Sequence, residues 1–170
     1  MDGEKVQDLI YNWLNRHYPE GPGWQDPDFD CYGDAPIEIK MISAFDAVEY
    51  NIGNGGWSQV LWNCFGCWRK LLEIAAEGYT LIGAPERADA LRELYVLCER
   101  DEKECEKVIY TDTPSEDTED FAEFTRRSYG VTGNDWQRLF WFDSGIYEKR
   151  LEWLAQNEAR IRRAIGELSA

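Results

Sequence analysis

Basic residues are scarce in this sequence. It has 18 Lys and Arg against 33 Asp and Glu over 170 residues, so its formal net charge is −15. Small soluble domains usually carry a net charge of roughly 2–8 in magnitude. Binding to phosphates needs Lys and Arg that displace counterions, so this composition argues against DNA or RNA as a direct ligand. It favours a basic protein surface as the partner.

Histidine is nearly absent, and the familiar catalytic motifs are missing. The one histidine, His17, falls on the apolar side of the first predicted helix, where packing explains it better than catalysis. The sequence has no phosphate-binding glycine loop, no nucleophile elbow and no zinc-protease helix motif. We therefore expect neither an enzyme nor a bound cofactor.

A calcium loop is only partly present. The alternation of Asp26, Asp28 and Asp30 resembles the start of such a loop. However, Cys31 stands where the loop needs glycine, and Ile37 stands where it needs a bidentate glutamate. The sequence therefore predicts no calcium site in this segment.

Long apolar runs and paired cysteines are also lacking. No run approaches the roughly 20 apolar residues that span a bilayer, and the N-terminal residues lack the character of a signal peptide. Five cysteines without a secretion signal fit reduced thiols in the cytoplasm. Cys64 and Cys67 have knuckle-like spacing, but the other available pair, Cys98 and Cys105, is too widely spaced for the usual zinc pattern. Cys64 and Cys67 also fall inside a predicted helix.

Aromatic residues, in contrast, are plentiful. Eight Trp, nine Tyr and seven Phe accompany an apolar fraction of 44%. Disordered acidic chains are poor in such residues, so a folded acidic protein is expected. The length allows a substantial core, and no linker divides it. We predict one acidic helical domain over residues 1–170.

The apolar spacing is helical through most of the chain. Repeats at i, i+3 and i+4 predict helices over residues 4–18, 34–51, 57–77, 85–99, 113–128, 134–142 and 146–168. Residues 99–113 could form a helix tail or a short strand. No strand ladder is evident, so the prediction is an all-α bundle of about six to eight helices.

The predicted last helix, over residues 146–168, carries a coiled-coil type seam. Its apolar positions alternate four and three apart over roughly three heptads. This face could pack within the chain's own bundle, or it could form a homodimer interface. Both interpretations remain open from the sequence.

The acidic charge is concentrated in two windows. Residues 20–49 contain eight acids and one base, and residues 99–123 contain eleven acids and three bases, so their charges of −7 and −8 sum to −15. Carboxylates three or four apart on a helix lie about 5–6 Å from one another, which resembles the spacing of DNA phosphates. The predicted partner-binding residues are Asp26, Asp28, Asp30, Asp34, Asp101, Glu102, Glu104, Glu106, Asp112, Glu116, Asp117, Glu119, Asp120 and Glu123.

A motif in the middle of the chain resembles a known family. The motif comprises Asn54, Gly55, Gly56, Trp57, Gln59 and Asn63. The acid Glu49 precedes it, and Gly66 and Ile82-Gly83-Ala84 follow it. This pattern, over about residues 45–98, resembles the bacterial DNA-mimic protein family typified by DNA mimic protein nineteen, a domain-of-unknown-function group. The resemblance implies an all-helical, acidic and often dimeric protein without catalysis, which occupies the DNA-binding surface of a helix-turn-helix repressor.

The motif residues have a structural explanation of their own. Gly55 and Gly56 permit backbone angles that a side chain would forbid at a tight helix–helix corner. Trp57 would then anchor the next helix, while Gln59 and Asn63 could hydrogen-bond the loop backbone. We therefore interpret the motif as scaffold and not as contact surface.

Two functions fit these observations. The first is a DNA mimic that inhibits a basic nucleic-acid-binding protein, acting as an anti-repressor on a transcription factor or as an anti-defence protein on a nuclease. The alternative is an immunity protein that neutralises one cognate basic toxin. A mimic competes with DNA for its target, whereas an immunity protein has one tight partner.

Overall fold

A computed structural model of the chain describes residues 2–19, 35–109, 139–140 and 145–167. These residues form six helices and no strand, which confirms the predicted all-α fold for this part of the chain. The helices are α1 (Gly3–His17), α2 (Ile37–Asn63), α3 (Trp68–Leu81), α4 (Pro85–Ile109), α7 (Ile146–Gln156) and α8 (Glu158–Ala164). None of them combines the length and the apolar character needed to cross a membrane.

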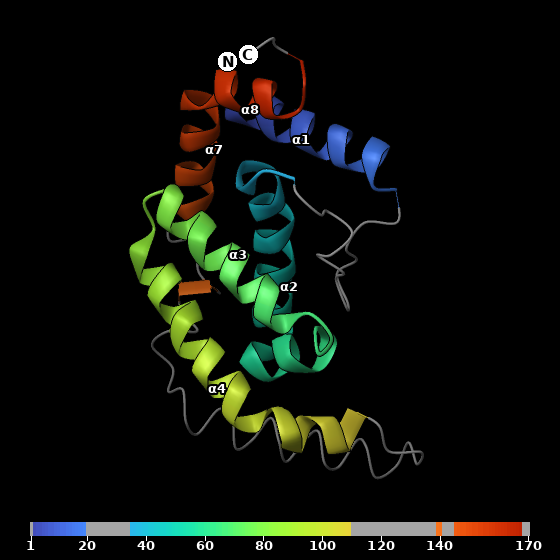
Figure 1. Cartoon of the computed structure of the whole chain (residues 1–170). Helices are drawn as coiled ribbons and strands as arrows, with labels where there is room; N and C mark the ends of the chain where they lie inside the picture. The colour runs from blue at the N-terminus through green and yellow to red at the C-terminus, as the bar shows by residue number, and fades with distance from the viewer. Residues whose placement is uncertain (1, 20–34, 110–138, 141–144, 168–170) are drawn as a thin grey trace.

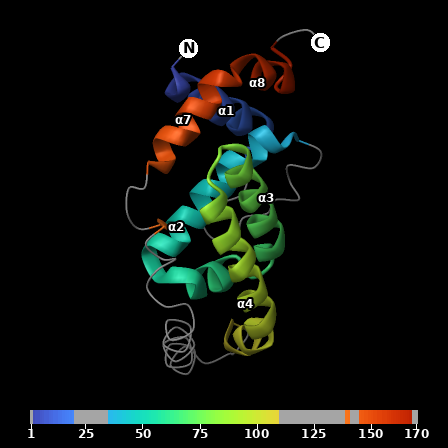
Figure 2. The same ribbon diagram turned by 90° about the vertical axis from the view of Figure 1, so that its left-hand side faces the viewer.

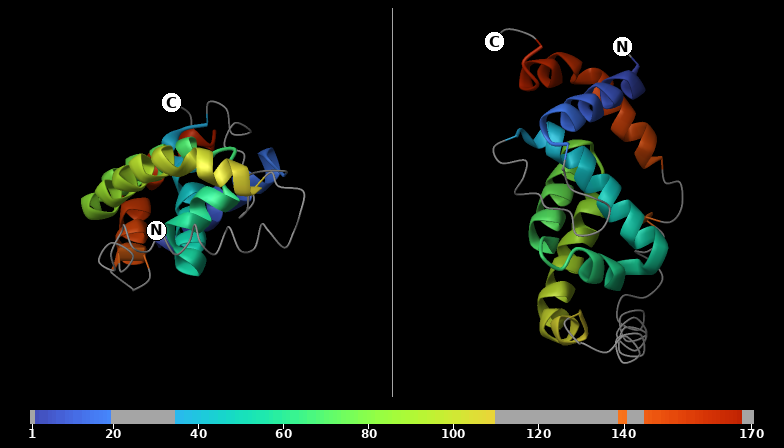
Figure 3. Two further views of the ribbon diagram at one scale, coloured as in Figure 1. Left: turned by 90° about the horizontal axis from the view of Figure 1, so that it is seen from below. Right: turned by 90° about the vertical axis from the view of Figure 1, so that its right-hand side faces the viewer.

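Two groups of helices make up this fold. In the first group, α3 packs along both α2 and α4 (Figure 1). The second group is α1 with α7 and α8, and it lies across one end of α2 (Figure 2). The far end of α4 extends beyond α3, as the views from below and from the right show (Figure 3). Among the described residues, side chains on the outer faces of α3 and α4, such as Glu73 and Glu93, are exposed.

Helix α1 matches its predicted range within one residue. Asp2 caps it, because the Asp2 side chain accepts a hydrogen bond of 3.3 Å from the backbone N–H of Glu4. Val6, Ile10 and Leu14, spaced four apart, are buried along its inner face. This stripe packs against the C-terminal helices and α2.

Helix α2 is longer than predicted. It continues through Gly53 and Asn54 and bends at Gly56, whose φ of 72° lies in the left-handed region. The prediction that this helix ends near Asn51 is therefore wrong, whereas the corner predicted at Gly55 and Gly56 is confirmed at Gly56. Ile52 and Trp57 are buried on either side of the glycine-rich stretch, so tertiary packing overrides the weak helix propensity there.

The single helix predicted over residues 57–77 is divided in the structure. Cys64 ends α2, and the backbone N–H of Cys67 donates a 2.9 Å hydrogen bond to the carbonyl of Cys64. A turn therefore separates α2 from α3, which begins at Trp68. The prediction that Cys64 and Cys67 lie inside a helix is wrong.

Helix α4 resolves an alternative that the sequence left open. It runs to Ile109, so residues 99–109 are a continuation of the helix and not a strand. The helices predicted over residues 113–128 and 134–142 lie outside the described residues, except that residues 139–140 are helical.

The helix predicted over residues 146–168 is also divided. The backbone N–H of Asn157 bonds to Trp153 and Leu154, and its side chain donates to the Trp153 carbonyl over 2.8 Å. These bonds close α7, and α8 starts in a new direction. Leu154 and Ile161, two positions of the predicted seam, are buried where α7 and α8 meet α1 and α2. These two seam residues thus pack within the chain, whereas Tyr147 of the same seam is exposed.

Candidate functional site

Two arginines and two acids form an ion network at the centre of the fold. Arg150 Nη2 lies 2.7 Å from Glu49 Oε2, and Arg150 Nη1 lies 3.2 Å from Asp46 Oδ1. Arg87 Nη1 lies 2.7 Å from the other oxygen of Glu49. Arg87 is 5% exposed and Arg150 is 4% exposed. Helices α2, α4 and α7 are therefore joined through charge pairs whose arginines are buried.

Two tyrosines complete this network. Tyr11 Oη donates to Asp46 over 2.5 Å, and Tyr79 Oη donates to Glu49 over 2.8 Å. Burial, followed by the charge of the neighbouring carboxylate, raises the pKa of both phenols. Burial also raises the pKa of Asp46, although Tyr11 and Arg150 oppose this shift. The phenols stay protonated, so they remain donors to the carboxylates.

Three acids of the first acidic window, residues 20–49, form ion pairs within the fold. Glu38 is buried and forms an ion pair with Arg160 of α8. Asp46 and Glu49 belong to the central network. These three acids are neutralised by arginines from outside the window. They hold helices together and are not available to a partner.

The motif residues support the bend of α2. Trp57 is 1% exposed and anchors the segment after the bend at Gly56. Asn63 donates a 2.8 Å hydrogen bond to the side chain of Asn51, so this bond joins the two arms of α2 and does not go to the loop backbone. Asn54 donates to the carbonyl of Tyr50 over 2.7 Å. Gln59 Oε1 occupies the space that a Cβ on Gly55 would fill.

Three of the predicted partner-binding acids have described side chains. Glu102 accepts hydrogen bonds from Arg69 and from the indole of Trp68, and the Arg69 bonds are the main cause that lowers its pKa. Asp101 pairs with Arg100 over 2.7 Å. Glu106 is exposed on the last turns of α4. Of these three, Glu106 is the acid most open to a partner.

The side chains of the other predicted partner-binding acids lie outside the described part of the structure. Glu104 belongs to α4, but its side chain lies outside the described part. The remainder lie wholly outside the described residues: Asp26, Asp28, Asp30, Asp34, Asp112, Glu116, Asp117, Glu119, Asp120 and Glu123. Their role in partner binding stays a prediction.

Four acids that the sequence did not single out are exposed on α3 and α4. Glu73 and Glu77 lie on α3, and Glu86 and Glu93 lie on α4. None of the four has an ion-pair or hydrogen-bond partner among the described residues. Residues 69–93 look almost neutral in sequence because four basic residues offset five acids there.

The ion pairs explain why charge counting missed these acids. Arg69 pairs with Glu102, Arg87 pairs with Glu49, and Arg92 pairs with Asp89. Two of these pairs reach into the acidic windows on either side. These three arginines already have acidic partners. Glu73, Glu77, Glu86 and Glu93 are therefore left without a counter-charge among the described residues, in a segment that looks almost neutral in sequence.

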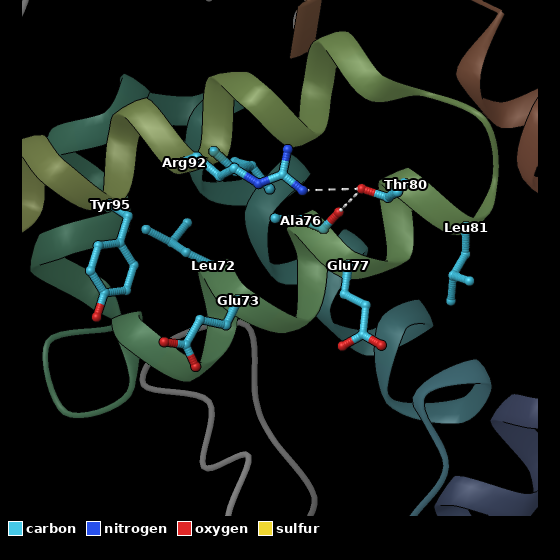
Figure 4. Close-up of a pocket in the computed structure, with 9 residues that line it drawn as sticks. Leu72, Glu73, Ala76, Glu77, Thr80, Leu81, Arg92 and Tyr95 are labelled. Carbon is cyan, nitrogen blue, oxygen red and sulfur yellow. Dashed lines mark hydrogen bonds between the residues drawn. The ribbon is translucent and has the colours of Figure 1, made fainter.

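A groove of about 500 Å³ runs between α3 and α4. Its lining includes Glu73 and Glu77 together with apolar side chains and Arg92 (Figure 4). Arg92 Nη2 donates to Thr80 Oγ1 over 3.3 Å, so it links the two helices beside the groove. The same helix pair therefore presents free carboxylates and an apolar recess.

No group of cysteine, histidine or acidic side chains in the described part is arranged to hold a metal ion. Cys64 and Cys98 are buried, and Cys67 is partly buried. The described surface offers exposed carboxylates and an apolar groove for contact with a partner.

Comparison with known proteins gives one family. The sequence model of the family described as DMP19-like protein matches residues 33–157. This range includes the motif at the bend of α2, the exposed acids of α3 and α4, and both arginines of the central network. No curated protein and no solved structure matches the chain.

Proposed function

Because this chain belongs to the DMP19-like protein family, we propose that it is an acidic DNA mimic. In this proposal it binds the basic nucleic-acid-binding surface of a partner protein and blocks access of DNA or RNA to that surface. The partner is a transcription factor or a defence nuclease. The chain acts by binding and catalyses no reaction.

The observation that carries this proposal is the set of uncompensated carboxylates on a firm helical frame. Glu73 and Glu77 lie four residues apart on α3, and Glu86 and Glu93 lie two turns apart on α4. Residues four apart on a helix are about 5–6 Å from each other. The central ion network and the packing of α3 against its neighbours hold these helices in place. Carboxylates spaced in this way imitate a row of phosphates.

The acidic segments predicted from sequence extend the same surface in this proposal. Glu106, on the far end of α4, is exposed and begins that extension. Residues 112–123 and 26–34 supply further carboxylates to the partner. A long negative surface steers a basic protein at low salt, and its attraction weakens as salt rises.

Competition with DNA tests this function. A tagged form of the chain captures its partner from the native host, and the purified partner is then bound to a fluorescent DNA duplex. We expect the chain to release the duplex in proportion to its concentration. Binding without release of the duplex would contradict the proposal.

A pair of fourfold variants tests the surface. Glu73→Gln, Glu77→Gln, Glu86→Gln and Glu93→Gln together should weaken competition by about tenfold or more, because each removes one charge from the proposed contact. The control is Glu4→Gln, Asp8→Asn, Glu148→Gln and Glu152→Gln, which makes the same change in charge on exposed positions of α1 and α7. Equal losses in the two variants would place the contact elsewhere.

A third variant tests the segment predicted from sequence. Asp117→Lys, Asp120→Lys and Glu123→Lys together reverse three charges of the second acidic window. We expect weaker partner binding with an unchanged circular dichroism spectrum. Unchanged affinity would move the proposed contact to Asp26, Asp28, Asp30 and Asp34.

A further inference from the structure

The groove between α3 and α4 has an apolar floor. Leu72, Ala76 and Leu91 form this floor and are almost fully buried. Tyr95 stands at one end of the groove and Leu81 at the other, as Figure 4 shows. A volume of about 500 Å³ is within the range of recesses that hold a ligand or the side chains of a peptide.

The rim of the groove is negatively charged on one side. Glu73 and Glu77 are exposed there and have no ion-pair or hydrogen-bond partner in the part of the chain that the structure describes. On the other side, Arg92 Nη1 is 2.6 Å from Asp89 Oδ1, so its charge is matched. The two unmatched carboxylates leave the rim with a net charge of about −2. An apolar floor beside a negative rim complements a ligand that is apolar and basic.

A mimic of DNA alone would need no apolar recess, because phosphates carry the charge and DNA presents no aliphatic side chains of this kind at its backbone. The groove therefore adds a second requirement to the recognition of charge. It selects a partner that places apolar side chains next to its Lys and Arg residues. This would separate one basic protein from the many others in a cell.

We infer that the groove binds an amphipathic basic helix of the partner protein. This inference rests on the proposed function, because the helix belongs to the basic surface that the chain blocks. Apolar side chains of the helix lie on Leu72, Ala76 and Leu91. Lys or Arg residues one turn apart face Glu73 and Glu77, whose own spacing is also one turn. The arrangement is the helix-in-groove mode of recognition with an added charge pair.

Labelled synthetic peptides test this inference directly. The probe is a fluorescent peptide of about 18 residues, or about five helical turns, with Leu on one face and Lys on the other. A second peptide has Ser in place of every Leu and keeps the same charge. We expect the Leu/Lys peptide to bind the full chain at least about tenfold more tightly at about 0.15 M NaCl, because surface charge attraction is partly screened there and apolar burial is not. Equal affinities would overturn the inference, because they would show recognition of charge alone.

Three variants locate the bound peptide. Thr80→Trp places a bulky side chain at the exposed edge of the groove without changing the charge. Glu73→Gln with Glu77→Gln removes the charged rim. Each of these two changes should weaken binding of the Leu/Lys peptide by about tenfold. The third variant, Glu4→Gln with Asp8→Asn, changes two exposed acids that are also four apart on a helix. It should change the affinity for the peptide less than about twofold. Circular dichroism and thermal unfolding confirm that each variant is folded.

The outcomes separate this inference from the proposed function. If the partner competes with DNA and Thr80→Trp leaves its affinity unchanged, the groove is not used and the inference fails alone. If the Leu/Lys peptide binds in the groove but the captured partner keeps its DNA, the proposed function fails alone. A dimer in sedimentation that Thr80→Trp dissociates would show that a second copy occupies the groove, which would also overturn the inference.

Discussion

Individual arginines determine where the negative charge of this chain is neutralised. Arg150 contacts Asp46 and Glu49 together, and its guanidinium also lies over the ring of Phe45 at 5.3 Å. The charges of Glu49 and Asp46 raise the pKa of Arg150, although burial works in the opposite direction. A buried arginine with two acid partners stabilises a fold mainly because its removal would take a counter-charge from each of those acids.

This reasoning predicts a large loss of stability for Arg150→Met. We expect the free energy of unfolding to fall by about 3–5 kcal/mol, because Asp46 would lose its arginine partner and Glu49 one of its two in a partly buried site. Unfolding in urea, followed by tryptophan fluorescence, measures this loss. The control is Arg100→Met, which breaks the exposed pair with Asp101 and should cost no more than about 1 kcal/mol. Similar losses in both variants would show that the network contributes no more than a surface pair.

The sequence singled out Glu49 but could not identify its partners. Glu49 precedes the central motif, so it drew attention as a motif residue. Arg150 lies 101 positions further along the chain and Arg87 lies 38 positions further. No local pattern connects residues at such separations, and each arginine in the sequence resembles any exposed one. The network follows from how the helices pack, which spacing alone does not reveal.

The close approach of α1 and α7 depends on a residue without a side chain. A Cβ at position 3 would lie 2.1 Å from the backbone oxygen of Leu151, which is too close for any heavy-atom contact. The backbone of α7 cannot move aside as a flexible side chain would. Gly3 therefore sets the distance between α1 and α7.

We predict that Gly3→Ala destabilises the fold by about 1–3 kcal/mol, the usual cost of forcing extra atoms into a packed contact. The matched control is Gly53→Ala on α2, where a Cβ would meet nothing within 4 Å. That variant should be stabilised by about 0.5–1 kcal/mol, because alanine favours the helix more than glycine does. Thermal unfolding compares the two. A stabilised Gly3→Ala variant would mean that α1 and α7 do not pack this closely.

Helix positions were predictable wherever the apolar stripe was strong. The stripe through Val6, Ile10 and Leu14 located α1 within one residue at each end. The errors fall at the helix end predicted near Asn51, at the turn near Cys64, and at Asn157, whereas the bend at Gly56 fits the corner predicted there. At each of these places the local residues allow both a helix and a break. Burial of neighbours such as Trp57 and Leu154 decides the outcome, and burial is a property of the assembled fold.

For the chain as a whole, the net charge of −15 does not reveal which acids are neutralised within the fold. Counting charges by window assumes that acids are neutralised by bases close in sequence. In the structure, Arg160 reaches Glu38 and Arg69 reaches Glu102 across long stretches of chain. Glu38 and Glu102, inside the windows, are thereby neutralised, whereas Glu73, Glu77, Glu86 and Glu93 have no partner in the part of the chain that the structure describes.

The same excess of charge predicts that salt acts in opposite directions on folding and on partner binding. Like charges repel in the folded chain, so screening by added NaCl should raise its stability, even though exposed ion pairs weaken. The attraction to a basic partner should weaken over the same range. Urea unfolding and partner titration at about 0.02, 0.15 and 0.5 M NaCl, where the screening length falls from roughly 20 Å to less than 5 Å, measure both effects. Near pH 4.4, the pI of the sequence, the stabilising effect of salt on folding should disappear, because the net charge is then close to zero. If salt lowered the stability at pH 7, attraction within the ion pairs would outweigh the repulsion, and little surplus charge would be left to imitate a polyanion.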